Sequence, residues 1–498
     1  MFRKVLIANR GEIAVRVVRT LREMEIATVA VFSDADRTSL HVRMADEAEW
    51  VGPSPSTESY LRIDRILDAA RKHRADAIHP GYGFLSENPD FAAACEDAGI
   101  VFIGPSAESI RRMGSKTAAR HMALAAGVPV VPGAQDALGS VEEARAFGAR
   151  HGYPLLLKAV AGGGGKGMRR VDADSELESA FRDAASEAER AFRNPDLYVE
   201  KLIERPRHIE IQILGDRHGN MIHFGERECS IQRRHQKVME ECPSPLVTVR
   251  PGMREAMGEA AIRAVRSAGY YNAGTVEFLV DAAGDFHFLE MNTRLQVEHP
   301  ITELVTGHDL VRLQVEVAAG EKLRLRQEDI AWRGSAIECR IYAEDPYNNF
   351  FPSPGRITRL TRPLGPGVRI DGCVYDGWTV PIDYDPLLAK LAVWSRTRAS
   401  AIARTLRALR EYDVAGIRTN ITFFRQILED EQFRQGSLHT RFVDEFLDRR
   451  KPFAPPPELE SIAALVAAFH DNGRAAPTET GPARRSRWLE IGRDGMLR

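Results

Sequence analysis

Strand-like and helix-like patterns of apolar residues alternate along the first 114 residues of the chain. Short apolar runs predict strands, and apolar positions three or four residues apart predict helices. The expected strands are residues 4–8, 28–32, 77–78 and 100–103, and the expected helices begin at Glu12 and cover residues 60–73. This alternation is typical of a doubly wound α/β domain, which we expect over residues 1–114. The first turn, residues 9–12, lacks GxGxxG, which disfavours an NAD-dependent oxidoreductase.

Further segments follow this first domain. Residues 115–320 begin with a small α/β pattern around a glycine run and continue, from Pro206, with strand-like runs. Residues 334–447 predict a mixed α+β domain with helices at 399–410 and 420–428. The tail, residues 448–498, opens with a proline-rich stretch and becomes polar, so we expect a linker or peripheral tail there.

One predicted hairpin carries the strongest chemical signal. Residues 275–280 and 286–292 are strand-like, and the connection between them contains the glycine of a short turn. Symmetric pairing places Glu277 opposite Glu290, with Cβ atoms roughly 5 Å apart. Two carboxylates this close are destabilising unless their pKa values rise or a cation lies between them. A divalent metal is the obvious candidate for that cation.

The residues that follow Glu290 along the same strand face are also polar. With a period of two, one face carries Phe286, Phe288, Glu290, Asn292, Arg294, Gln296 and Glu298. A solvated hairpin face would by itself explain the charged residues. Apolar residues on both faces of the strand, however, predict that the strand is buried. Because buried polar groups need partners, a metal with an anionic substrate is the favoured interpretation.

The glycine run gives a second signal. The predicted buried strand 153–160 contains Lys158 and leads directly into residues 162–167, Gly-Gly-Gly-Gly-Lys-Gly. Glycines let backbone N–H groups surround phosphate oxygens, and the two lysines add positive charge. The run is not a Walker A loop, because Lys166 is followed by Gly167. A flexible linker is the alternative to a nucleotide-binding lid.

Two more segments are candidates for ligand contacts. Residues 226–237 carry Arg233, Arg234, His235 and Lys237, which form either solvated surface or, near the phosphate loop, an anion site. Tyr82 lies between two glycines after a first-domain strand, at the sheet end where α/β proteins usually bind ligands. A tyrosine buried in a turn is the alternative for Tyr82.

Composition narrows the class of protein. The 498 residues are 44% hydrophobic and 28% charged, which suits a soluble globular protein of about two to four domains. A net charge of -2 gives no basic field for nucleic acid or a membrane surface, and we expect neither as a partner. The five cysteines form no CxxC pair and fit reduced thiols. With no signal-type segment at the N-terminus, we expect a cytoplasmic protein.

Six segments together resemble a known family. They are HPGYGFLSEN (79–88), AGGGGKGM (161–168), RHIEIQIL (207–214), CSIQRRHQK (229–237), EMNTRLQVEHP (290–300) and ECRIYAEDP (338–346). In this order they resemble biotin carboxylase, an ATP-grasp carbon–nitrogen ligase, and the likeness runs from residue 1 to about 447. It implies an ATP-grasp fold over residues 115–320 with a mobile glycine-rich lid at about 131–203. The implied reaction is ATP- and bicarbonate-dependent carboxylation of biotin through carboxyphosphate.

The resemblance also implies a role for individual residues. The ATP-binding residues would be Lys116, Lys158, Gly164, Gly165, Glu200, Lys201, Leu202, Ile203, His208, Gln232, His235, Glu277 and Glu290. The metal ligands for Mg²⁺ or Mn²⁺ would be Glu277, Glu290 and Asn292. Bicarbonate would contact Lys237, Arg294, Gln296 and Val297, with Glu298 as the catalytic base and Lys237 and Arg294 as further catalytic groups. Tyr82 and the catalytic Arg340 would hold biotin.

The resemblance also implies partner proteins for this chain. Residues 448–498 contain no Met-Lys-Met biotinyl-acceptor motif, so biotin carrier protein and carboxyltransferase subunits are expected as separate chains. Acetyl-CoA is the expected final acceptor, within fatty acid synthesis; another acyl-CoA, pyruvate or another 2-oxoacid is the alternative. A homodimer is expected from the family. A carbamoyl phosphate synthetase relative would have no use for Arg340 or Tyr82, and a non-catalytic ATP-grasp protein would be expected to lack Glu298, Arg294 or a metal ligand.

Overall fold

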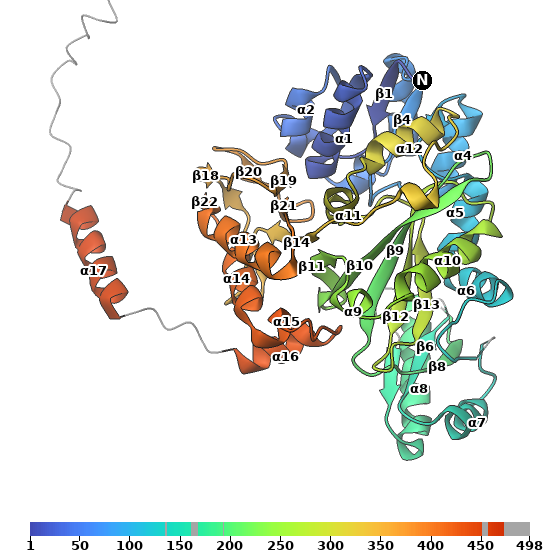
Figure 1. Ribbon diagram of the computed structural model, residues 1–498. Coiled ribbons are helices and arrows are strands. Elements are labelled where there is room, and N and C mark those ends of the chain that lie inside the picture. Colours follow the sequence, from blue (N-terminus) through green and yellow to red (C-terminus); the bar gives the residue numbers. More distant parts are fainter. Residues whose placement is uncertain (135–136, 161–167, 193, 451–456, 473–498) are drawn as a thin grey trace, which may run out of the picture. The chain divides into compact units, whose positions relative to one another are not determined.

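The computed structural model describes residues 1–498 apart from 135–136, 161–167, 193, 451–456 and 473–498 (Figure 1). Two compact units are present, Met1–Phe446 and Leu447–Arg498. Gly164 and Gly165, which we expect to bind phosphate, lie outside the described residues, and so does the side chain of Lys116. No helix in the described ranges is long and apolar enough to cross a membrane.

The N-terminal domain is built on a parallel sheet with the strand order β3-β2-β1-β4-β5. Its elements are β1 (Lys4–Ile7), α1 (Gly11–Glu23), β2 (Ala27–Ser33), α2 (Leu40–Met44), β3 (Glu47–Gly52), α3 (Ile63–Lys72), β4 (Ala77–His79), α4 (Pro89–Asp97), β5 (Val101–Phe102) and α5 (Ala107–Gly114), with 3-10 turns at Asp34–Asp36 and Ser56–Glu58. The doubly wound prediction is confirmed. The strand order reverses between β1 and β4, and the turns that follow these two strands meet where such folds bind ligands.

A smaller sheet in the middle of the chain has the order β7-β6-β8. Helix α6 (Lys116–Ala125) precedes it and packs against β13 and α10; the sheet consists of β6 (Leu155–Ala159), β7 (Met168–Val171) and β8 (Leu197–Lys201), and its helices are α7 (Val141–His151) and α8 (Asp174–Phe192). Leu155, Leu157 and Val199 are buried in a separate core beneath α7 and α8, and β6, β8, α7 and α8 lie together at one end of the unit (Figure 1). This segment corresponds to the predicted lid, whose mobility stays a prediction.

An eight-stranded antiparallel sheet forms the centre, in the order β13-β12-β9-β10-β11-β14-β21-β19. Its strands are β9 (Arg207–Gly215), β10 (Met221–Arg233), β11 (Gln236–Cys242), β12 (Asn272–Val280), β13 (Phe286–Asn292), β14 (Ser335–Tyr342), β19 (Val368–Gly372) and β21 (Leu387–Ser395). The helices along it are α9 (Pro245–Thr248), α10 (Met253–Arg266), α11 (His299–Thr306) and α12 (Leu310–Ala318), followed by a 3-10 turn at Gln327–Asp329. Because β11 pairs with β14, the hydrogen bonding continues from the predicted 115–320 segment into 334–447.

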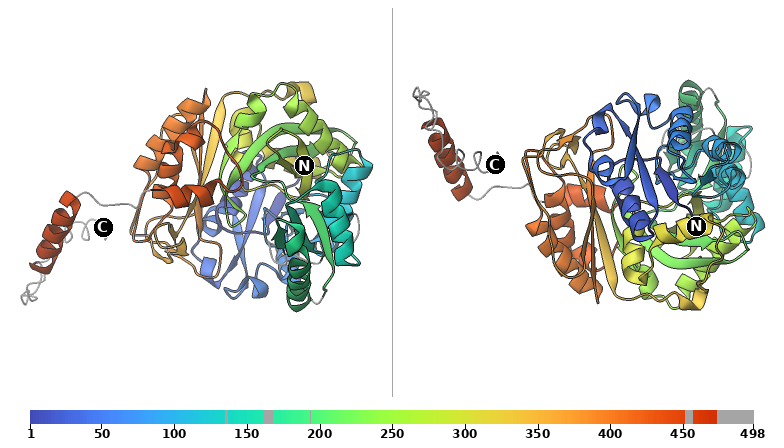
Figure 2. Two further views of the ribbon diagram at one scale, coloured as in Figure 1. Left: turned by 90° about the horizontal axis from the view of Figure 1, so that it is seen from below. Right: turned by 90° about the horizontal axis from the view of Figure 1, so that it is seen from above.

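The remaining elements of the first unit pack around the end of this sheet. They are β15 (Glu344–Asp345), β16 (Phe351–Pro352), β17 (Gly355–Arg356), β18 (Arg359–Thr361), β20 (Thr379–Val380), α13 (Arg398–Glu411), β22 (Asp413–Ala415), α14 (Ile421–Glu429), α15 (Glu431–Arg434) and α16 (Phe442–Arg449). Helix α1 contacts β19, and both views in Figure 2 show the C-terminal elements (orange) beside the N-terminal domain (blue).

The second unit contains a helix that the sequence pattern did not predict. Helix α17 spans Pro457–Asn472 within the expected polar tail. Its large apolar side chains, Ile462, Leu465, Val466 and Phe469, are all exposed. Eight consecutive apolar residues, 462–469, lie within this helix, between two polar stretches of the sequence. The expectation of a linker or peripheral tail stays a prediction.

Candidate active site

A cavity of about 810 Å³ lies between the small sheet and one face of the eight-stranded sheet. Most of the predicted site residues line it, although they come from distant parts of the sequence. Those residues are Lys158, Glu200, Lys201, Leu202, Ile203, His208, Gln232, His235, Lys237, Glu277, Glu290, Asn292, Arg294, Gln296, Val297 and Arg340. Glu298 lies completely buried behind the wall, and Tyr82 lines a neighbouring cavity.

The predicted hairpin has the predicted register at its central pair. Glu277 on β12 lies opposite Glu290 on β13. Between this pair and the next, Phe278 with Phe288, the register shifts, which leaves Leu289 as an extra residue on β13. Phe288 therefore packs in the core, while Leu289 lines the cavity with Glu290. The expectation that Phe288 shares the face of Glu290 is wrong because of this bulge.

The prediction that five polar groups leave a single strand in one direction is also wrong. Strand β13 ends at Asn292, and the rest of the set lies in the loop before α11. The guanidinium of Arg294 nevertheless connects two members of the set, since it donates to Gln296 Oε1 at 3.1 Å and to Asn292 Oδ1 at 3.3 Å. Its Nε donates to Glu87 Oε2 at 2.6 Å, so the N-terminal domain holds the arginine from outside the sheet.

The metal-binding prediction is tested by the donor set around Glu277. Asn292 Nδ2 donates to Glu277 Oε1 at 2.8 Å, and the other carboxylate oxygen lies 2.9 Å from His208 Nε2. Two carboxylates and an amide oxygen at one hairpin are hard oxygen donors, which suit Mg²⁺ or Mn²⁺. Burial alone would raise the pKa of Glu277, but the positive charges of Lys237 and His208 lower it well below its usual value.

Lys237 is the cation that compensates the buried carboxylates. Its ammonium donates to Glu277 Oε1 at 2.7 Å, to Glu298 Oε1 at 2.8 Å and to Glu210. Three donors thus meet three carboxylates, which satisfies the ammonium completely. Sequence reasoning missed Glu210. Its signal was a glutamate between the apolar neighbours Ile209 and Ile211, in a strand that is buried from His208 onward.

Glu298 is held from its other side by Arg340. Arg340 Nη2 donates to Glu298 Oε2 at 2.9 Å, while its Nε donates to Glu240 Oε1 at 2.7 Å. Burial would raise the pKa of Glu298, but Lys237 and Arg340 outweigh it and hold the pKa well below the usual value. Glu240, which sequence reasoning also missed, has its pKa raised to about 7, chiefly by burial. Glu298 is therefore an ionised carboxylate between two cations.

The nucleotide side of the cavity combines Lys158 with the segment after β8. Lys158 forms an ion pair with Glu200, which also lies 3.5 Å from Arg120 Nη1. Gln232 Nε2 lies 2.8 Å from His208 Nδ1. Burial would lower the pKa of His208, but Glu277 outweighs this and raises it. Cationic and amide groups thus line this side of the cavity.

The residues of the basic segment 233–237 have two different roles: some contact the C-terminal domain, and others line the cavity. Arg233 forms a double ion pair with Glu344, both distances being 3.0 Å, and Arg234 donates to Asn349 Oδ1 at 3.2 Å. These two arginines attach β10 to the C-terminal domain. Only His235 and Lys237 of the four predicted cations line the cavity, which corrects the interpretation of the whole cluster as an anion site.

Tyr82 and Arg340 line a second cavity of about 440 Å³, which shares Arg294 and Val297 with the first. Gly81 and Gly83 on either side of Tyr82 have φ values of +64° and +69°, as the predicted tight turn requires. Asn9, after β1, donates to the backbone carbonyl of Tyr82 at 2.8 Å. The turns after β1 and β4 therefore form one wall of this cavity, and Arg340 forms part of another.

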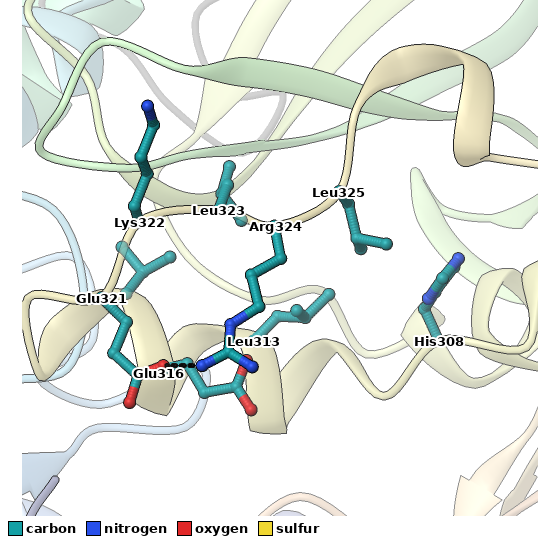
Figure 3. A pocket seen from close by; sticks show the side chains of 9 residues that line it. His308, Leu313, Glu316, Glu321, Lys322, Leu323, Arg324 and Leu325 are labelled. Atoms are coloured by element: carbon teal, nitrogen blue, oxygen red, sulfur yellow. Dashed lines mark ion pairs between the residues drawn. The ribbon is translucent and has the colours of Figure 1, made fainter.

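A third cavity, of about 210 Å³, lies beside the end of α12 (Figure 3). Its walls include His308, Leu313 and Arg324, and Arg324 is paired with Glu321 at 3.5 Å. None of the predicted site residues lines it. The two larger cavities, which share Arg294, Val297 and Arg340, are therefore the candidate active site.

Comparison with known proteins agrees with this geometry. Residues 1–110 match the family description "Biotin carboxylase, N-terminal domain", residues 115–326 match "Carbamoyl-phosphate synthase L chain, ATP binding domain", and residues 338–445 match "Biotin carboxylase C-terminal domain". The chain is 53% identical to a pyruvate carboxylase subunit of Methanothermobacter thermautotrophicus over 479 residues, which cover 96% of this chain and 97% of that protein. It is 53% identical to a biotin carboxylase of Nostoc sp. over 444 residues, which cover 89% and 99%.

A solved structure extends the comparison to the fold. The biotin carboxylase domain of 2-oxoglutarate carboxylase from Hydrogenobacter thermophilus, a dimer in complex with MgADP, ADP and bicarbonate, is 48% identical. It superimposes with a TM-score of 0.83 over 90% of this chain and 98% of that domain. The chain belongs to the biotin carboxylase family of ATP-grasp ligases.

Proposed function

We propose that this chain transfers a carboxyl group from bicarbonate to the biotin of a separate carrier protein, with hydrolysis of ATP to ADP. The observation that carries the proposal is the buried carboxylate Glu298, held between Lys237, which lines the larger cavity, and Arg340, which lines both. A carboxylate between two anion-binding cations suits a reaction in which a bound oxyanion gives up a proton. In this proposal, ATP binds on the nucleotide side and biotin binds on the side of Tyr82.

Bicarbonate binds, in this proposal, at the meeting point of the cavities. Lys237, Arg294, Gln296 and the backbone of Val297 hold the anion, and Glu298 accepts its proton. The low pKa of Glu298 keeps it ionised at neutral pH and ready to accept. Lys237 now pairs with three carboxylates, so binding of an anion redirects part of this positive charge toward substrate. The deprotonated anion then attacks the γ-phosphate.

ATP occupies the other end of the larger cavity. Lys158, His208, Gln232 and His235 face its phosphates or ribose, with Lys116, Gly164 and Gly165 as further phosphate ligands, and residues 200–203 hold the adenine. Glu277, Glu290 and Asn292 would hold Mg²⁺ or Mn²⁺, which neutralises the charge of the transferring phosphoryl group. The products of this step are ADP and carboxyphosphate. Closure of the 131–203 lid keeps water from the labile product.

Biotin enters through the cavity that contains Tyr82 and Arg340. Carboxyphosphate breaks down to CO₂ and phosphate, and the phosphate removes a proton from the ureido nitrogen of biotin. Arg340 stabilises the negative charge that then develops on the ureido oxygen, and the nitrogen attacks CO₂. Since Arg340 also contacts Glu298, the arginine links the two halves of the reaction.

The expected partners are a biotin carrier protein and carboxyltransferase subunits, with acetyl-CoA as the final acceptor and fatty acid synthesis in the cytoplasm as the setting. A homodimer is supported by the dimeric biotin carboxylase domain to which the chain is similar. A second candidate acceptor is pyruvate or another 2-oxoacid. The match with the Methanothermobacter pyruvate carboxylase subunit spans 479 residues and so continues into the tail, whereas the match with the Nostoc enzyme spans 444.

The decisive experiment measures ADP release by the purified chain with ATP, Mg²⁺ and bicarbonate, with and without a high concentration of free biotin. We expect release that needs bicarbonate and rises with biotin. Release that is indifferent to biotin would favour another ATP-grasp substrate, and no release would favour a non-catalytic nucleotide-binding protein. Arg340→Ala should abolish the response to biotin; an unchanged response would contradict the role of Arg340.

A further inference from the structure

Lys390, in the middle of β21, is a buried cation without a role in the proposed reaction. Its side chain is completely buried, which is rare for lysine and requires partners. The ammonium donates to the backbone carbonyl of Val297 at 2.8 Å and lies 3.3 Å from Glu12 Oε2. It also lies 5.5 Å from the centre of the Tyr82 ring. Lys390 therefore contacts the bicarbonate loop and two groups at the carboxyl edge of the N-terminal sheet.

The sheet register places this lysine beside Arg340. Arg340 on β14 and Lys390 on β21 lie directly opposite each other, so their side chains leave the same face of the sheet. Arg340 holds the carboxylate of Glu298, and Lys390 holds the carbonyl of the preceding residue, Val297. Two neighbouring cations thus donate hydrogen bonds to two consecutive residues of one loop.

The loop needs such a support, because its own secondary structure does not fix it. Strand β13 has ended at Asn292, and Glu298 is the N-cap of α11 without a side-chain capping hydrogen bond. The side chain of Glu298 points instead to Lys237 and Arg340. The hydrogen bond from Lys390 orients the peptide between Val297 and Glu298. An error of about 1 Å in the placement of a reacting group can lower a rate about 100-fold.

Charge balance is the competing explanation for Lys390. The carboxylates of Glu12, Glu338 and Asp371 face the ammonium from α1, β14 and β19. A lysine that served only these carboxylates would affect stability and leave the affinity for bicarbonate unchanged. The hydrogen bond to Val297 predicts a kinetic effect in addition, and this difference separates the two explanations.

We infer that Lys390 is a positioning residue that holds the Val297–Glu298 peptide in the orientation required to bind and deprotonate bicarbonate. This inference rests on the proposed function. Lys390→Met should raise the KM for bicarbonate at least tenfold in the ADP-release assay, while the KM for ATP changes less than about twofold. Lys390→Arg keeps a charged donor and should restore the KM for bicarbonate to within about threefold of the wild-type value.

Arg398→Met is the matched control. Arg398 forms a double ion pair with buried Glu241, at 2.7 and 2.9 Å, in the same C-terminal region but without contact to the bicarbonate loop. Its loss should lower the unfolding temperature and leave the KM for bicarbonate unchanged. If Lys390→Met does not fold, Lys390→Gln, a shorter neutral donor, replaces it and should raise the KM for bicarbonate by a smaller factor.

A folded Lys390→Met or Lys390→Gln variant with the wild-type KM for bicarbonate would overturn the inference. An equal rise in the KM for ATP would also overturn it, since that result indicates a general disturbance of the site. Failure of the proposed function gives a different result, because the wild-type chain itself would then show no bicarbonate-dependent release of ADP.

Discussion

Glu298 must be both buried and ionised to act as a base inside the protein. Complete burial favours the protonated acid, which could not accept a proton. Lys237 and Arg340, at 2.8 and 2.9 Å, reverse this preference and keep the carboxylate ionised. The same two cations are attractive to a bound anion, so the base and the anion site depend on one set of charges. Removing the acceptor oxygen should therefore affect chemistry more than structure.

Glu298→Gln keeps the size and shape of the side chain and removes its ability to accept the bicarbonate proton. We expect bicarbonate-dependent ADP release to fall by about 10²–10⁴-fold, the usual contribution of a positioned base. Glu321→Gln, in the small cavity beside α12, is the control and should keep full activity. An active Glu298→Gln enzyme would show that another group removes the proton.

Much of this site could be predicted from single residues in the sequence, and the exceptions have physical causes. The Glu277–Glu290 pairing followed from strand length and turn length alone, and the structure confirms it. Glu210 and Glu240 were missed because the local sequence around a strand glutamate does not show which cation its carboxylate meets. Their importance comes from Lys237 and Arg340, which lie 27 and 100 positions away in the sequence.

At the scale of elements, local periodicity fails where backbone irregularity begins. The bulge at Leu289 reverses the faces expected for Phe288, and the loop after Asn292 replaces the expected strand. A period of two assumes a regular ladder, and sequence patterns do not reveal a bulge. The strand β3, with three charged or aromatic residues at 47–50, was missed since its apolar character is weak. Tertiary pairing with β2 determines it.

Arg227 joins several elements beneath the active site. Its completely buried guanidinium on β10 donates to Glu210 and Gln212 of β9, Thr275 of β12 and Thr302 of α11. Arg227→Met would leave these groups without their donor, and breaking a buried ion pair in this way costs about 3–5 kcal/mol. We expect the free energy of unfolding, measured with urea, to fall by that amount.

An exposed arginine provides the comparison for this prediction. Arg359 also forms an ion pair, with Asp413, but both side chains are exposed. Arg359→Met should change the free energy of unfolding by less than about 1 kcal/mol. Similar losses in the two variants would contradict the assignment of Arg227 as the residue that joins these strands.

His79, at the end of β4, makes the turn that carries Tyr82 sensitive to acid. Its buried Nδ1 accepts a hydrogen bond from the Gly81 N–H at 3.0 Å, which requires an unprotonated nitrogen. Burial lowers the pKa of His79 from 6.5 to about 4. Between these values the unfolded chain binds a proton that the folded chain does not, so this contribution to stability is lost as the pH falls.

His79→Asn retains an acceptor for Gly81 and does not titrate. The wild-type protein should lose about 1.4 kcal/mol per pH unit relative to this variant between pH 6.5 and 4, and nothing above pH 7. Comparing the two proteins by urea unfolding cancels the opposite effect of Glu12, whose pKa is raised to about 7 by burial. Parallel stability curves would show that His79 is protonated in the folded protein.

At the scale of the whole molecule, the first unit contains every residue proposed for catalysis. Residues Met1–Phe446 form a compact unit, and α16, which ends at Arg449, packs Phe442, Val443 and Phe446 into it. Helix α17 belongs to the second unit, with its large apolar side chains exposed. Since folding and chemistry should both reside in the first unit, we expect that the tail can be removed without loss of either.

A chain that ends at Arg450 should therefore unfold within about 2 °C of the full-length protein, because a short helix with exposed apolar side chains adds little stability. Its release of ADP with free biotin should equal that of the full chain. A large loss of thermal stability or of activity would mean that the tail packs on the catalytic unit. Replacing Leu465 and Phe469 by serine in the full chain distinguishes that outcome from a loss caused by truncation itself, since only a packed helix would show the same defect.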